Sequence, residues 1–155
     1  MGYTHYFTFL DCHGNTATVE RAYQNAIKDC NKIIAAYYNK NKGTELSLSG
    51  YSAHSNNYGG INLNGKGELG HEAFNLREHF KQNLGFNFCK TARKPYDIVV
   101  TACLVVLKYH LANFIEVSSD GQNIDWIQGL NLAYESTDNI RLFNPIYKDI
   151  TELNK

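Results

Sequence analysis

Apolar side chains recur every three or four residues from Thr16 to about Asn39, and this spacing predicts a long amphipathic helix. A second helix is predicted from Pro95 to about Leu111, because proline is favourable at the first helical position. Asp97 in its first turn suits the positive end of a helix. This second run is apolar nearly all round, so we expect it to form the buried centre of the fold.

Alternating side chains predict a strand at residues 3–10, and a segment rich in branched residues predicts another at 114–119. The glycine-rich middle of the chain is strand-like in TELSLSGY and YGGINLNG, with a tight turn expected at Asn64–Gly65. HEAFNL reads as a short strand or an extended segment, and REHFKQNLG as a helical turn or a loop. DWIQGLNLAYES predicts a third helix, weakened by Gly129. The expected fold class is α+β: one domain, residues 1–155, with a mainly antiparallel sheet against two long helices and a shorter third helix. Residues 139–155 read as an irregular tail, anchored by Leu142, Phe143 and Ile146.

The charge balance argues against general nucleic-acid binding, since 15 basic residues match 15 acidic ones. The N-terminus lacks the pattern of a signal peptide, and Lys108 and His110 interrupt the longest apolar stretch. We therefore expect a soluble cytoplasmic protein with no membrane contact; self-association stays open. The 4 cysteines form no CxxC motif, which favours reduced thiols, with Cys30 and Cys103 packed on helix faces. No cofactor motif is present and no ligand set has metal-site spacing, so no metal or cofactor is expected.

The segment FCKTARKPYD concentrates three cations, Lys90, Arg93 and Lys94, directly before the second long helix. A helix N-terminus offers free N–H groups and a partial positive charge, and Thr91 adds a hydroxyl. Cations gain nothing from the dipole at this end of a helix, which favours a bound anion. The alternative is a solvated loop whose cations pair with Asp97 or Glu72.

Several other polar residues each allow a structural and a functional interpretation. His5 and Tyr3 share an aromatic strand face, which fits either a buried histidine or a wall for a ring-shaped ligand. His71 fits a general base, a ligand contact or a structural histidine. Ser118, Ser119 and Asp120 suit a helix cap or a ligand site at the end of a strand. Cys89 is a weaker candidate nucleophile, whose pKa the nearby cations would lower.

Several of these segments together resemble a family of small proteins associated with bacteriophages and bacteria. The similar segments are MGYTHYF at the start, NG at 64–65, HEAF at 71–74, FCKTARKPYD at 88–97, and SSDG at 118–121 with Trp126. The resemblance spans residues 1 to about 130, and the decapeptide is its most specific part. A phage association implies host takeover or counter-defence.

The expected function is capture of a small anionic, nucleotide-like signalling ligand by a phage-type binding protein, a form of sequestration. The alternative is a nucleotide-directed hydrolase or phosphodiesterase, with His71 or His5 as the acid–base group and Glu72 or Asp120 as its partner. A third reading is a protein-interaction module that blocks a host enzyme. The expected ligand-binding residues are Tyr3, His5, Tyr6, Asn64, His71, Glu72, Lys90, Thr91, Arg93, Ser119 and Asp120.

Overall fold

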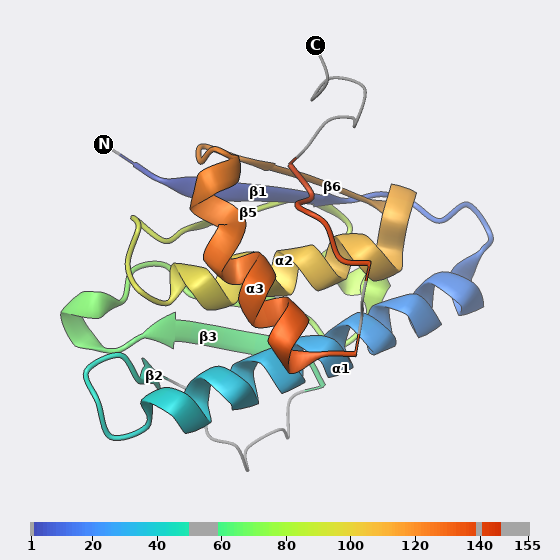
Figure 1. Cartoon of the computed structure of the whole chain (residues 1–155). Helices are drawn as coiled ribbons and strands as arrows, with labels where there is room; N and C mark the ends of the chain where they lie inside the picture. The colour runs from blue at the N-terminus through green and yellow to red at the C-terminus, as the bar shows by residue number, and fades with distance from the viewer. Residues whose placement is uncertain (1, 50–58, 139–140, 147–155) are drawn as a thin grey trace.

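Residues 2–49, 59–138 and 141–146 are described by a computed structural model. This part of the chain contains three helices and two three-stranded antiparallel sheets (Figure 1). The helices are α1 (Thr16–Asn41), α2 (Asp97–Leu111) and α3 (Ile127–Ser136). The first sheet has the order β5–β1–β6, from Gly85–Lys90, Thr4–Phe9 and Ile115–Ser119. The second has the order β2–β3–β4, from Leu48–Ser49, Ile61–Gly65 and Phe74–Leu76. The predicted α+β class is confirmed.

Helix α2 is the centre of the fold, as its all-round apolar sequence predicts. It lies between the β5–β1–β6 sheet and α1, and α3 crosses it (Figure 1). Of its 15 residues, 10 are buried, including every position from Val99 to Leu107. Contrary to the sequence expectation, Asp97–Phe114 is long and apolar enough to cross a membrane, but 56% of that span is buried inside the fold. Its hydrophobicity is therefore used in the core of a globular domain.

Strand β5 is an element that the sequence analysis missed. It pairs with β1 in an antiparallel register that places Cys89 opposite His5. Its apolar residues Phe86 and Phe88 point outward and are 64% and 55% exposed, so its pattern does not mark a core-facing strand. This strand leads directly into the cationic segment and delivers it to the start of α2.

Two boundaries also differ from the predictions. Asn64 and Gly65 end strand β3, and a short 3₁₀ turn at Gly67–Leu69 follows, so the turn comes later than expected. Helix α2 begins at Asp97, after a turn that contains Pro95. The undecided segment after β4 forms a 3₁₀ turn at Phe80–Asn83, and further 3₁₀ turns occur at Ala112–Phe114 and Asn123–Trp126. Of the predicted TELSLSGY strand, Leu48–Ser49 is observed, and residues 50–58 lie outside the described residues.

The segment after α3 is partly described. Leu142 is buried and Ile146 packs against the core, as expected, whereas Phe143 is exposed. Residues 139–140 and 147–155 of the predicted tail lie outside the described residues.

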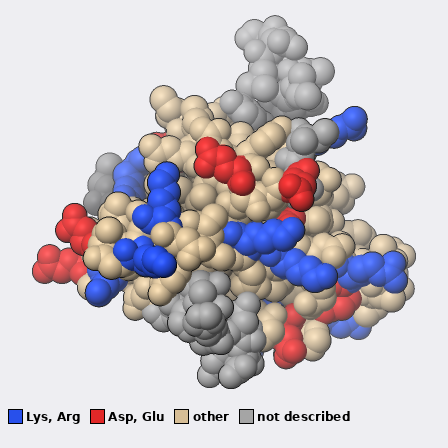
Figure 2. All heavy atoms as spheres, turned by 60° about the horizontal axis from the view of Figure 1, so that its bottom comes forward, with Lys and Arg blue, Asp and Glu red and all other residues tan. Residues whose placement is uncertain are grey.

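The surface is mixed in charge. Figure 2 shows one face, on which Lys and Arg side chains are interspersed with Asp and Glu. Over the described atoms of this face no continuous basic surface forms, and this matches the balanced composition.

Candidate functional site

Asp97, in the first turn of α2, is the centre of a buried polar network. Its Oδ1 lies 2.5 Å from Nε2 of His5 and accepts the hydroxyl of Thr91 at 2.6 Å. The other ring nitrogen of His5 lies 2.8 Å from Oγ of Ser119. Because the N–H of Gly121 donates to that oxygen at 2.9 Å, the Ser119 hydroxyl can direct its own hydrogen to His5. The network thus assigns the His5 N–H to the nitrogen that faces Asp97.

The network joins four elements that are far apart in the sequence: β1, the end of β5, the start of α2 and the end of β6. His5 and Thr91 are fully buried, and the Asp97 side chain is 14% exposed. The rings of Tyr3 and Trp126 meet His5 edge-on, each with centroids 5.0 Å away. His5 is therefore a satisfied core histidine, whereas Asp97 and Ser119 are partly exposed.

The loop between β5 and α2 has an unusual backbone. Ala92 and Arg93 both adopt the left-handed region, with φ of 52° and 58°. For residues with a Cβ this costs about 1–2 kcal/mol each. The Ala92 N–H donates to the carbonyl of Tyr3 at 3.2 Å, and the Lys94 N–H to that of Thr91 at 3.0 Å, which holds the loop in place. Strain of this kind is concentrated at functional sites, which makes this loop a candidate.

The left-handed turn directs Arg93 toward Tyr3 and Asp125. Its guanidinium carbon lies 4.1 Å from the centre of the Tyr3 ring, and its Nη1 lies 3.0 Å from Oδ1 of Asp125. The Arg93 side chain remains 60% exposed. The pairing of a cation with a protein carboxylate matches part of the alternative raised from the sequence, although the partner is Asp125 rather than Asp97 or Glu72.

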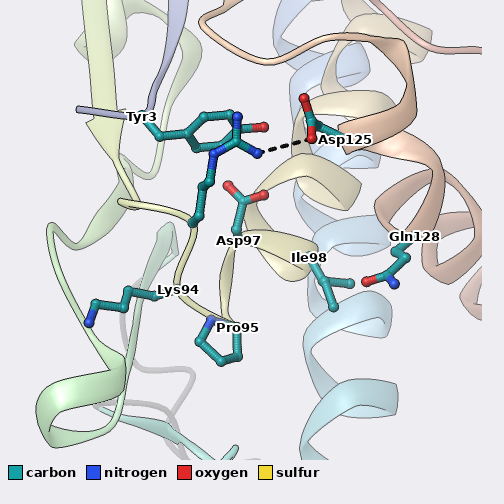
Figure 3. Close-up of a pocket in the computed structure, with 8 residues that line it drawn as sticks. Tyr3, Lys94, Pro95, Asp97, Ile98, Asp125 and Gln128 are labelled. Atoms are coloured by element: carbon teal, nitrogen blue, oxygen red, sulfur yellow. Dashed lines mark hydrogen bonds and ion pairs between the residues drawn. The ribbon is translucent and has the colours of Figure 1, made fainter. Parts of the chain in front are cut away.

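A hollow of about 200 Å³ lies beside this pair. Figure 3 shows the side chains of Asp97 and Asp125 turned toward Tyr3, whereas Lys94 extends away from both carboxylates. The Tyr3 hydroxyl is buried against Gly121, near Ser119, and has no hydrogen-bond partner of good geometry among the described residues. Burial, followed by the charges of Asp97 and Asp125, raises the pKa of Tyr3 to about 12. At neutral pH the phenol therefore keeps its proton.

The prediction that free backbone N–H groups at the start of α2 would bind an anion is wrong. In the turn before α2 and in its first residues, the N–H groups of Asp97, Ile98 and Val99 bond to the carbonyls of Lys94, Pro95 and Tyr96. An anion in the hollow would therefore meet side chains rather than a row of free backbone N–H groups.

Four of the predicted site residues form a second cluster, at the junction of β3 and β5. The Asn64 amide bonds to both the N–H and the carbonyl of His71, at 3.0 and 2.9 Å. His71 Nδ1 lies 3.1 Å from the carbonyl of Lys90, and a Glu72 oxygen accepts the Lys90 N–H at 2.7 Å. These contacts fasten the two strands together, and none of these four residues lines the 200 Å³ hollow. Lys90 packs its side chain against Gly2.

Tyr6 and Asp120 lie on the outer face of the first sheet. Asp120 accepts the N–H of Thr4 at 3.0 Å and the hydroxyl of Tyr6 at 3.1 Å, and the Tyr6 ring stacks on Phe86. The expected helix cap at Ser118–Asp120 is therefore wrong. Asp125 caps instead, because its Oδ2 accepts the N–H of Gln122 at 2.8 Å ahead of α3.

The structure thus brings together Tyr3, His5, Thr91, Arg93 and Ser119 of the predicted set. It adds Asp97, Asp125 and Lys94, which were not in that set. The position of Asp97 inside the decapeptide was a usable signal. No local sequence pattern marked Asp125 as a site residue, because its partner Arg93 lies 32 residues away in the sequence.

All four thiols are buried, including Cys89. Burial, helped by the charge of Glu72, raises the pKa of Cys89 to about 12, so the expectation that cations lower it is wrong. Because the thiolate is the reactive form, we predict that native protein at pH 8 reacts negligibly with a thiol reagent. Unfolding in denaturant should release all 4 thiols in the same assay. A thiol that reacts rapidly in the native protein would contradict this.

Within the described ranges, no group of three or more His, Cys, Asp or Glu side chains is placed to hold a metal ion. Comparisons of the chain with protein-family models, curated proteins and solved structures find no match. What indicates a function is therefore the geometry of the site.

Proposed function

We propose that this protein binds a small anionic, nucleotide-like ligand in the hollow between Tyr3, Arg93 and Asp97. One observation carries the proposal: a strained loop holds an exposed arginine beside a hollow that Tyr3 and Asp97 also line. A planar guanidinium binds phosphate or carboxylate with two parallel hydrogen bonds.

Arg93 must leave Asp125 to take a ligand. Its contact with Asp125 is one hydrogen bond, from Nη1 to Oδ1 at 3.0 Å, on a side chain that is 60% exposed, and exposed pairs of this kind are weak. A phosphate can instead accept two parallel hydrogen bonds from the guanidinium. Asp125 does not lose its other partner in the exchange. The Gln122 N–H is the main reason that the pKa of Asp125 lies below its usual range, and Arg93 lowers this pKa further. A phosphate can therefore displace Asp125 without leaving that carboxylate unsatisfied.

The other groups around the hollow suggest the rest of the ligand. Among the residues that the structure describes, no carboxylate lies within ion-pair distance of Lys94, so its charge is available. Asp97 directs one oxygen into its network, and its second oxygen accepts no hydrogen bond from any residue within the described ranges. A ligand with both a phosphate and hydroxyl or amino donors matches this lining of mixed charge. Nucleotides have this combination.

Sequestration in the cytoplasm of a host cell is the biological role that we propose for such binding. It follows from the resemblance to phage-associated proteins together with a site for a soluble anion. In this role the protein lowers the free concentration of a signalling nucleotide and need not change it chemically.

Hydrolysis is the second candidate, favoured by the Asp97–His5–Ser119 chain of hydrogen bonds, which has the residue types of a nucleophilic triad. Access argues against it. His5 is fully buried, and neither His5 nor Ser119 lines the hollow. In this chain Asp97 is the carboxylate partner of His5, the part that the sequence analysis gave to Glu72 or Asp120.

Calorimetric titration with a panel of mono-, di- and cyclic nucleotides tests the proposal. Arg93→Ala should weaken binding about tenfold to over a hundredfold, as expected for one charge-assisted contact. Arg93→Lys should also lose affinity, because an ammonium cannot make the planar fork. Thermal melts of these variants should stay close to wild type, because the Arg93–Asp125 pair is exposed. Unchanged binding of a nucleotide by Arg93→Ala would contradict the proposal.

Mass spectrometry of the incubated nucleotides separates the two candidate functions. Recovery of the intact nucleotide after heat release supports binding, and recovery of a cleaved product supports hydrolysis. If no nucleotide is retained or altered, both candidates fail and the protein-interaction reading remains.

A further inference from the structure

A second hollow, of about 340 Å³, adjoins the first. The two share three lining residues: Pro95, Ile98 and Gln128. Figure 3 shows Ile98 and Gln128 side by side at the end of the first hollow that lies away from Tyr3. The second hollow continues from there between the end of α1, the start of α2 and the outer side of α3. A ligand can therefore extend from one hollow into the other across these two side chains.

The lining of the second hollow differs in chemistry from that of the first. Leu46, Ile98 and Leu132 give the lining apolar walls, and α1 adds the ring of Tyr37. The lining also has three amide side chains, among them that of Asn131, and one charge of each sign, from Lys40 and Glu135. Apolar walls with a few amides suit a flat heteroaromatic ring, which packs by its faces and forms hydrogen bonds at its edge.

Size also favours a single extended site. The first hollow, at about 200 Å³, is smaller than the roughly 300–1,000 Å³ of typical small-molecule sites. It accommodates a phosphate or a sugar phosphate and no ring system beside it. With the 340 Å³ of the second hollow added, the space falls within the range for a whole nucleotide.

We propose that the two hollows form one site for a nucleotide, with the phosphate at Arg93 and the base between α1 and α3, against Ile98 and Leu132. This inference rests on the proposed function and extends it, because it makes the base a source of affinity. The ligand class is then a nucleotide, and sugar phosphates or inorganic anions bind only through the phosphate end.

Blocking the base end alone tests this inference. Asn131 is an exposed residue of α3 that lines the second hollow and not the first. Asn131→Trp should fill the second hollow and leave the phosphate end unchanged. The matched control is Ile127→Trp, on the same helix at a 50% exposed position that lines neither hollow. Leu46→Ala, at a 38% exposed position, removes part of the wall without added bulk. Thermal melts establish that each variant is folded.

Titrations with a nucleoside 5′-monophosphate, ribose 5-phosphate and inorganic phosphate give the readout. Wild type should bind the nucleotide at least tenfold more tightly than ribose 5-phosphate. Asn131→Trp should bind the nucleotide about tenfold or more weakly than wild type and should bind ribose 5-phosphate with unchanged affinity. Leu46→Ala should lose nucleotide affinity by a smaller factor. Ile127→Trp should bind both compounds as wild type does. The proposal that the base binds in the second hollow would be overturned if wild type bound the nucleotide and ribose 5-phosphate equally and if Asn131→Trp and Leu46→Ala both kept wild-type affinity for the nucleotide. If Arg93→Ala still weakened binding in that case, the anion site at Arg93 would be retained. If none of the three compounds bound to wild type, both the anion site and the base site would be overturned.

Discussion

Replacing Asp97 by alanine should lower the free energy of unfolding by about 2–6 kcal/mol, because each of two buried donors that lose their acceptor costs about 1–3 kcal/mol. The change leaves two fully buried groups, the His5 ring and the Thr91 hydroxyl, without the acceptor that both use. In a domain of this size each kcal/mol lowers the melting temperature by about 2–4 °C. Calorimetric melting should therefore show a decrease of roughly 10 °C.

Two control variants separate this effect from a general loss of charge. Asp97→Asn retains an oxygen that can accept from His5 or Thr91, so it should cost clearly less than the alanine variant. Asp125→Asn removes a charge whose pair with Arg93 is exposed and retains an oxygen for the Gln122 N–H, so it should cost about 1 kcal/mol or less. An Asp97→Ala protein as stable as wild type would show that the network does not hold β1, β6 and α2 together.

Gly129→Ala should produce the second large change in stability. It should destabilise the protein, although helix propensity alone predicts that alanine stabilises it. In an open helix position, alanine is favoured over glycine by about 1 kcal/mol. A Cβ at Gly129 would lie 2.0 Å from Oγ1 of Thr101 and 3.0 Å from the backbone nitrogen of Ala102, both in α2. Relief of this overlap requires α3 to move away from α2, and overpacking of this kind costs about 1–3 kcal/mol. Denaturant titration should therefore show a net loss of stability.

Asn131→Ala is the matched control for Gly129→Ala, because Asn131 is exposed on the same helix. It should leave stability unchanged or raise it by a few tenths of a kcal/mol through propensity. A stabilised Gly129→Ala protein would contradict the close contact between α2 and α3.

Periodicity predicted the helices well, since their amphipathic or fully apolar patterns directly reflect burial. The helix around Gly129 illustrates the limit. Sequence reasoning treats this glycine as a weak point, whereas the structure shows a position where two helices approach closely. At this approach Gly129 faces Thr101, which lies 28 positions earlier in the sequence, so no local pattern encodes the contact.

The candidate site was predicted in part. The decapeptide holds Thr91, Arg93 and Asp97, so its charge pattern pointed to the right loop. The sequence could not show that two residues there take left-handed backbone angles, because neither is a glycine. It also could not divide the polar candidates into those that face the hollow and those that join strands, such as Asn64. That division depends on the register of β1, β5 and β6.

The most direct test of the central claim compares nucleotide binding by wild type, Asp125→Asn and Arg93→Ala. Asparagine at position 125 no longer holds Arg93 by charge, yet it retains an oxygen for the Gln122 N–H. If an anionic ligand competes with Asp125 for Arg93, titration with a nucleoside 5′-monophosphate should show tighter binding by Asp125→Asn. The gain should be up to about fivefold, since the exposed pair is worth at most about 1 kcal/mol. Arg93→Ala should bind about tenfold or more weakly, and adding Asp125→Asn to it should restore nothing. Weaker or unchanged binding by Asp125→Asn, together with wild-type affinity in Arg93→Ala, would contradict the account and leave the pair as part of the scaffold.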